Sequence, residues 1–101
     1  MRPRIEISTQ QLARFCKKHG IRKLAFFGSV LRDDFGPKSD VDILIEFEPH
    51  VQIGYIGLAR LERELSRLLG RRADLHTPEG LSPYMRDAVL QEASVLYEQT
   101  G

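Results

Sequence analysis

The chain has 101 residues, a length typical of one domain with a single hydrophobic core. Its 42% hydrophobic and 29% charged residues exclude an intrinsically disordered protein, and a net charge of +1 gives no argument for binding nucleic acid or an acidic membrane surface. No signal peptide or membrane-spanning apolar run is evident, and there is one cysteine, so we expect a cytoplasmic protein that binds no membrane.

The first half of the chain predicts a helix followed by two strands. Ser8 has the chemistry of a helix N-cap, and Gly20 is placed to end the helix that follows. The next residues are densely apolar, and turn-forming residues separate them from a second apolar run. The predicted elements are a helix from 9 to 20, a buried strand over 21–27 and a second strand over 41–47.

The second half predicts two more helices and two short strands. Leucines at helical spacing predict a helix over 56–69 that Gly70 ends, and Ser82 followed by Pro83 is typical of a helix start. The remaining elements are strands over 73–77 and 94–97 and a helix over 84–92. This order predicts an α/β fold, a small two-layer sandwich with a mixed β-sheet and flanking helices, in one domain over 1–101.

A pair of acids at the start of the second strand is the most informative feature. Asp40 and Asp42 are two residues apart, so their side chains point to the same side of a strand. Two carboxylates this close repel each other unless a cation lies between them. Mg²⁺ prefers oxygen ligands and is often held by one or two carboxylates together with substrate phosphates. The pair therefore predicts a metal site, against the alternative of two exposed acids at a strand end.

Gly28 and Ser29 directly follow the first predicted strand, ten residues before the acid pair. A glycine lets the backbone approach a phosphate closely, and the serine hydroxyl can add a hydrogen bond. Arg32 follows by about one helical turn and could neutralise triphosphate charge. The alternative for Gly28 and Ser29 is a simple turn, and the alternative for Arg32 is an ordinary surface arginine. The spacing to the acid pair is what favours a phosphate-binding role.

A third acid would complete a site for two metal ions. Asp74 is the best candidate, because it lies on the predicted third strand, which could place it beside Asp40 and Asp42. His76 shares a face of that strand with Asp74 and could line the pocket. We do not expect His76 to bind metal, since oxygen ligands suit Mg²⁺ better than imidazole does.

These residues together resemble the minimal nucleotidyltransferase (MNT) family of the DNA polymerase β-like nucleotidyltransferase superfamily. The resemblance covers about residues 23–97, and Asp33 departs from it, because members of the family often have glycine there. It implies the polymerase β-like nucleotidyltransferase fold. The matching positions are Gly28, Ser29, Arg32, Ser39, Asp40 and Asp42 with the strand after them, Asp74 with its flanking residues 70–75, and the loop over 77–81.

The resemblance implies a mechanism with two Mg²⁺ ions and ATP as substrate. Asp40, Asp42 and Asp74 would be both catalytic residues and metal ligands, with Asp74 helping to deprotonate the acceptor hydroxyl. The outer phosphates would be held by Gly28 and Ser29, and Arg32 and Ser39 would add to the nucleotide site. The acceptor oxygen would attack the α-phosphorus, and pyrophosphate would leave.

The short chain has no room for the added helical domain that builds the acceptor site in larger relatives, so we expect a macromolecular acceptor. The resemblance points to the antitoxin of HEPN–MNT toxin–antitoxin pairs, which transfers AMP to a tyrosine of its HEPN ribonuclease partner. We expect no direct nucleic-acid binding. Two alternatives remain: a small-molecule nucleotidyltransferase acting as an oligomer, and a non-catalytic antitoxin that blocks its partner by binding.

Two groups of side chains are expected to have no part in the chemistry. Four arginines near helical spacing alternate with glutamates, which favours a solvated face over a docking surface; they are Arg60, Arg63, Arg67 and Arg71. The three tyrosines, Tyr55, Tyr84 and Tyr97, are expected to be packing residues.

Overall fold

A computed structural model describes residues 8–28 and 40–99 of the chain. In chain order these form α1 (Thr9–His19), β1 (Ile21–Phe27), β2 (Val41–Phe47), α2 (Tyr55–Leu69), β3 (Ala73–His76), a short 3-10 helix η2 (Pro78–Gly80), α3 (Pro83–Glu92) and β4 (Ser94–Glu98). Every predicted element is present, with its ends within one residue of the expected position. Among the described residues, no helix has the length and apolar character needed to cross a membrane.

Local chemistry sets the helix ends as predicted. The Ser8 hydroxyl accepts a hydrogen bond from the Gln11 N–H at the start of α1, and the Ser82 hydroxyl accepts one from the Met85 N–H at the start of α3. Gly20 and Gly70 both adopt the left-handed conformation, with φ of 68°, directly after α1 and α2. Such a conformation favours glycine, so these residues stop the helices where the sequence indicates.

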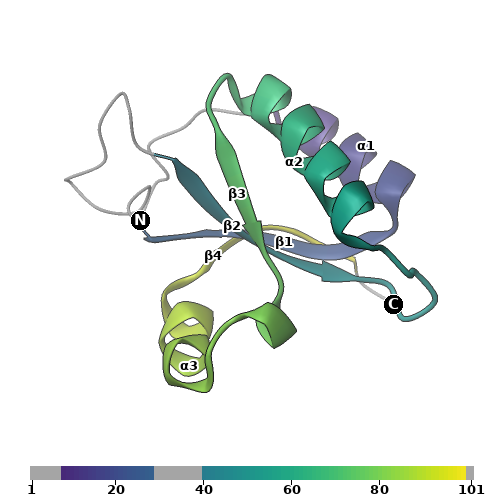
Figure 1. The fold of residues 1–101 in the computed structure, drawn as a ribbon. Helices are drawn as coiled ribbons and strands as arrows, with labels where there is room; N and C mark the ends of the chain where they lie inside the picture. The colour runs from purple at the N-terminus through teal and green to yellow at the C-terminus, as the bar shows by residue number, and fades with distance from the viewer. Residues whose placement is uncertain (1–7, 29–39, 100–101) are drawn as a thin grey trace.

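The four strands form one mixed sheet in the order β3-β2-β1-β4. β1 is antiparallel to both β2 and β4, whereas β2 and β3 run parallel with α2 as the connection between them. Figure 1 shows α1 and α2 side by side on one face of the sheet and α3 on the other. The predicted mixed sheet with flanking helices is confirmed.

The core lies between the sheet and the pair α1 and α2. Alternate residues of the strands point into it, including Phe26, Ile43 and Leu75. A smaller apolar cluster fills the space under α3, where Phe27 and Leu44 meet Val89. The sheet face that carries this smaller cluster is only partly covered, so polar side chains can be placed there.

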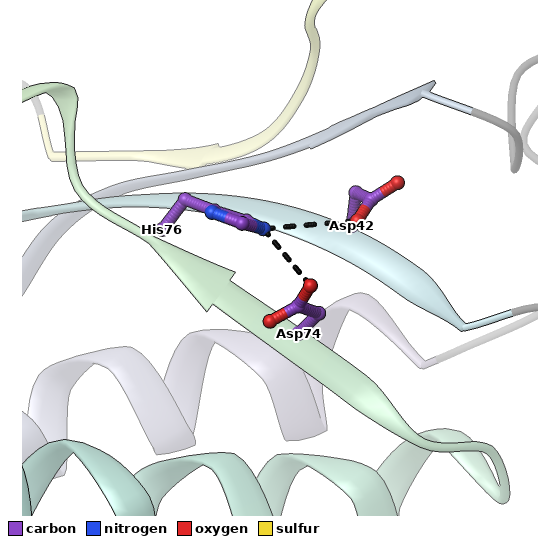
Figure 2. A group of neighbouring side chains, drawn as sticks. All are labelled: Asp42, Asp74 and His76. Carbon is purple, nitrogen blue, oxygen red and sulfur yellow. Dashed lines mark ion pairs between the residues drawn. The ribbon is translucent and has the colours of Figure 1, made fainter. Parts of the chain in front are cut away.

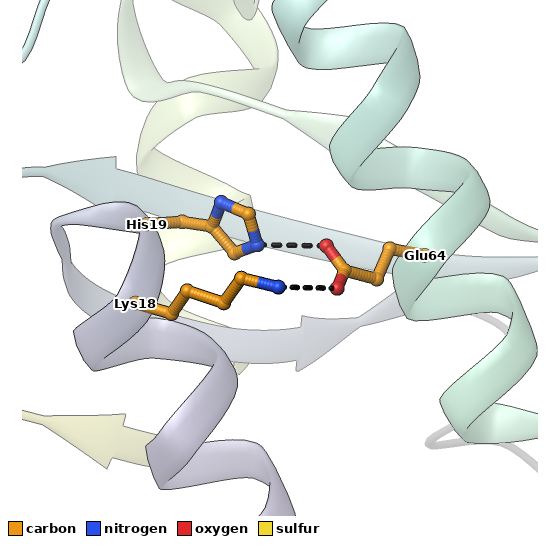
Figure 3. A network of polar contacts seen from close by, with 3 residues as sticks. All are labelled: Lys18, His19 and Glu64. Atoms are coloured by element: carbon orange, nitrogen blue, oxygen red, sulfur yellow. Dashed lines mark hydrogen bonds and ion pairs between the residues drawn. The ribbon is translucent and has the colours of Figure 1, made fainter.

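Figure 3 shows the polar contact that joins α1 to α2 at the edge of the core. The Glu64 carboxylate lies 2.7 Å from His19 Nε2 and 3.3 Å from Lys18 Nζ. Burial alone would raise the pKa of Glu64, but hydrogen bonds from His19 and Lys18 outweigh it, so the pKa is lowered. This contact lies on the sheet face opposite the acids Asp42 and Asp74, so it supports the fold and leaves the site free.

Candidate active site

Asp42 and Asp74 are direct neighbours across the parallel strands β2 and β3. Their neighbours Val41 and Ala73 are fully buried against α1 and α2, so the two acids point to the other face of the sheet. The Asp42 side chain is 30% exposed and the Asp74 side chain 50% exposed. The prediction that Asp74 lies on the same side as Asp42 is therefore confirmed.

His76 completes a group of three possible metal ligands with these acids. Its Nε2 atom lies 3.2 Å from Asp74 Oδ2 and 3.7 Å from Asp42 Oδ1, as Figure 2 shows. One ligand atom from each of the three residues lies within 4.8 Å of the others. The ring packs edge-on against Phe27, with the ring centres 5.3 Å apart.

Hydrogen bonds donated to side chains of α2 hold the strand that carries Asp74. The Ala73 N–H donates to Ser66 Oγ at 2.9 Å, and the Leu75 N–H donates to a Glu62 carboxylate oxygen at 3.1 Å. These two N–H groups would otherwise be left without partners on the outer edge of β3. Asp74 lies between them, so α2 fixes the backbone on both sides of the acid.

Gly28 brings the backbone against the Asp42 carboxylate. It has φ of +75°, and a Cβ atom added there would lie 2.5 Å from Asp42 Oδ2. Only glycine fits this position without moving the acid. The Gly28 N–H donates a hydrogen bond of 3.0 Å to the carboxylate of Glu92 at the end of α3. Gly28 therefore lies against Asp42 and is held by α3, and its contact with the nucleotide stays a prediction.

A cavity of about 420 Å³ opens beside Asp42, between the ends of β1 and β2 and helix α3. The sequence predicts Gly28 and Asp42, on the sheet side of the cavity, as site residues, but gives no signal for Glu92 on the helix side. Tyr84 is predicted to be a packing residue, whereas it is 95% exposed at the cavity. Tyr55 likewise projects into solvent, 93% exposed, so both expectations were wrong. The lining residues are Phe27, Gly28, Asp42, Tyr84, Met85, Ala88, Val89 and Glu92.

The electrostatics of the site favour a bound cation. Burial raises the pKa of Asp42 above its ordinary value, the negative charges of Asp74 and Asp40 raise it further, and His76 partly offsets this rise. A divalent cation among these groups would remove the repulsion between the acids. Two carboxylates and an imidazole are common ligands of divalent metals, so Asp42, Asp74 and His76 fit such an ion, whereas the sequence predicts Asp40 in place of His76.

Asp40 lies apart from the group formed by Asp42, Asp74 and His76. It is exposed and lies directly before β2. Its charge still reaches Asp42, as the pKa of that acid shows. The predicted site residues Ser29, Arg32 and Ser39 lie outside the described residues.

Comparison with known proteins defines the class. Residues 9–96 match the nucleotidyltransferase domain family, and the chain belongs to that family. It is therefore a nucleotidyltransferase, which agrees with the mixed sheet and the paired acids.

Several relatives have more specific assignments. A Methanocaldococcus jannaschii protein assigned as a protein adenylyltransferase is 37% identical over 76 residues, which cover 75% of this chain and 80% of that protein. The protein adenylyltransferase MntA of Thermococcus cleftensis is 36% identical over 76 residues, covering 75% of each chain.

Solved structures agree on the fold. The structure of a protein assigned as a minimal nucleotidyltransferase is 36% identical, with a TM-score of 0.69 over 84% of this chain and 85% of that one. A chain in the structure of a tri-AMPylated Shewanella oneidensis HEPN toxin in complex with an MNT antitoxin shares the fold, with a TM-score of 0.65 at 17% identity over 90% of this chain and 70% of that one.

Proposed function

We propose that this chain is a metal-dependent protein adenylyltransferase that transfers AMP from ATP to a tyrosine hydroxyl of a HEPN-type toxin, and so acts as the antitoxin. The observation that carries the proposal is the pairing of Asp42 with Asp74, next to the cavity that Asp42 and Gly28 line. Relatives at 36–37% identity that are assigned as protein adenylyltransferases support the adenylyl group and a protein acceptor. The fold shared with an MNT antitoxin complex makes a HEPN-type protein the first acceptor to test.

Asp40, Asp42 and Asp74 would hold two Mg²⁺ ions, which when bound would neutralise the triphosphate and stabilise the attacking and leaving oxygens. Gly28 and Ser29 would hold the outer phosphates, and Arg32 and Ser39 would add contacts to the nucleotide. We assign these roles to one domain over 1–101, which would act in the cytoplasm, where ATP is available.

We assign to Asp74 the role of accepting the proton from the acceptor hydroxyl. Its side chain is the more exposed of the paired acids, so an approaching protein hydroxyl can reach it. A tyrosine hydroxyl has a pKa of about 10 and is protonated at neutral pH, so its attack needs a group that accepts the proton. The Asp74 carboxylate would take that proton as the oxygen attacks the α-phosphorus, and pyrophosphate would leave.

Intact-mass spectrometry of a HEPN-type protein encoded beside this chain tests the proposal. The protein is incubated with this chain, Mg²⁺ and each of the four nucleoside triphosphates in turn. We expect the mass of one or more adenylyl groups to be added with ATP, and no addition by the Asp42→Asn variant. Full neutralisation of the toxin by a folded Asp42→Asn chain would instead favour an antitoxin that acts by binding alone.

A panel of small hydroxylated acceptors distinguishes the proposed function from that of a small-molecule nucleotidyltransferase. If ATP is consumed with such an acceptor and the HEPN-type protein stays unmodified, the chain is a small-molecule nucleotidyltransferase. Measurement of the chain's mass in solution during that reaction would show whether an oligomer builds the acceptor site.

A further inference from the structure

The histidine beside the paired acids has an unusual environment. Among the described residues, the buried His76 Nε2 has no hydrogen-bond partner, although a carboxylate oxygen of each acid lies within 4 Å of it. An imidazole nitrogen buried between two carboxylates would be expected to donate to one of them. Neither contact has hydrogen-bond geometry, so a simple bridge between His76 and an acid does not explain its position.

The distances suit a shared metal ion. With donors about 2.1 Å from an octahedral ion, adjacent donors are about 3 Å apart and opposite donors about 4 Å apart. The Nε2 atom lies 3.2 Å from Asp74 Oδ2 and 3.7 Å from Asp42 Oδ1, and all three ligand atoms lie within 4.8 Å of one another. Figure 2 shows Nε2 directed into the space between the two acids.

We propose that His76 is a direct metal ligand, and that its imidazole makes the Asp42–Asp74 site prefer a first-row transition-metal ion such as Mn²⁺ over Mg²⁺. This inference rests on the proposed function and concerns the metal used at the same site. Mg²⁺ takes oxygen ligands and loses its water reluctantly, whereas imidazole nitrogen is a good ligand for transition metals. The edge-on contact with Phe27 favours the ring position that directs Nε2 between the acids.

Electron paramagnetic resonance of bound Mn²⁺ tests the inference directly, because a coordinating nitrogen gives a hyperfine coupling that an oxygen ligand does not. The experiment uses the full chain without a histidine tag. The wild-type chain is expected to show the nitrogen coupling, and His76→Gln is expected to bind Mn²⁺ without it. The affinity for Mn²⁺ should fall by roughly tenfold or more, and the affinity for Mg²⁺ should fall much less.

The chain has three histidines, so the control set is complete: His19→Gln and His50→Gln should both keep the coupling. Mn²⁺ bound by the wild-type chain without nitrogen coupling would overturn the role of His76 and leave the acids and the proposed function intact. Absence of Mn²⁺ and Mg²⁺ binding by the folded wild-type chain would overturn both. Circular dichroism of each variant establishes that it is folded.

Discussion

Asp42 and Asp74 face each other across a parallel pair of strands, although they lie 32 positions apart in the chain. Neighbours in this register project side by side from the same face of the sheet. Two carboxylates placed in this way repel each other, so the fold holds an unfavourable arrangement that a cation relieves.

The first prediction concerns stability without metal. Burial and the neighbouring acids raise the pKa of Asp42 above its ordinary value of 3.8, so the folded state favours the protonated form of this acid. The stability that this preference contributes is fully present below the ordinary pKa and is lost as pH rises through the higher pKa of the folded state. In the presence of a chelator, the wild-type chain should lose stability relative to Asp42→Asn between acidic and neutral pH. Urea unfolding at a series of pH values measures this.

Asp87→Asn is the matched control for that series, since Asp87 is an exposed acid on α3. It should show no comparable change relative to the wild-type chain. An Asp42→Asn variant that is much less stable than the wild-type chain at neutral pH would mean that Asp42 is a structural residue.

The second prediction concerns Gly28. Alanine there must adopt φ of +75° and place its Cβ 2.5 Å from Asp42 Oδ2, so it is strained and also displaces the acid. A Cβ at position 70 would meet no atom of the described residues within 4 Å, so Gly70→Ala has only the strain of φ at +68°. We expect Gly70→Ala to lower stability by about 1–2 kcal/mol with metal binding unchanged, and Gly28→Ala to lower stability more and abolish metal binding. Isothermal titration calorimetry with Mn²⁺ measures the binding, and equal affinities in the two variants would refute the role of Gly28.

The third prediction concerns the hydrogen bond from Leu75 N–H to Glu62. Glu62→Ala removes the acceptor and should lower the free energy of unfolding by about 1.5–3 kcal/mol. Glu62→Gln keeps a side-chain oxygen and should recover part of the loss. Chemical denaturation measures both, with Arg63→Ala as the control, because Arg63 is exposed on the same helix. A loss no larger in Glu62→Ala than in Arg63→Ala would show that α2 does not hold β3 through this bond.

The fourth prediction concerns the single cysteine. Burial raises the pKa of the Cys16 thiol to about 12, so the reactive thiolate is essentially absent from the folded chain at about pH 8. A thiol-specific reagent should therefore modify the protein only as fast as the chain unfolds, and should find one thiol per chain in denaturant. Rapid modification of the folded protein would contradict the placement of Cys16 in the core.

Much of the fold could be predicted from local signals. Capping serines and left-handed glycines set the helix ends, as Ser8 and Gly20 show. Alternation of apolar and acidic residues placed Asp42 and Asp74 on the open face of their strands. The fold class and the pairing of the two acids on one side were therefore within reach of the sequence.

The other contributions to the site depend on packing between distant segments. The cavity forms because α3 folds back over the end of β1, which brings Glu92 to Gly28 across 64 positions. The support of β3 by Ser66 and Glu62 depends in the same way on how α2 lies against the strand. No local pattern encodes these contacts, and the position of His76 between the acids could be read only from the register of β2 and β3.

The central claim is that Asp42 and Asp74 serve the transfer of a nucleoside monophosphate. Phosphorus NMR of ATP incubated with this chain, divalent metal and a HEPN-type acceptor tests it most directly, because the phosphorus product reports which bond breaks. We predict that pyrophosphate accumulates with the wild-type chain and is nearly absent with folded Asp42→Asn or Asp74→Asn. Release of orthophosphate in place of pyrophosphate, or undiminished pyrophosphate release by either variant, would contradict the claim.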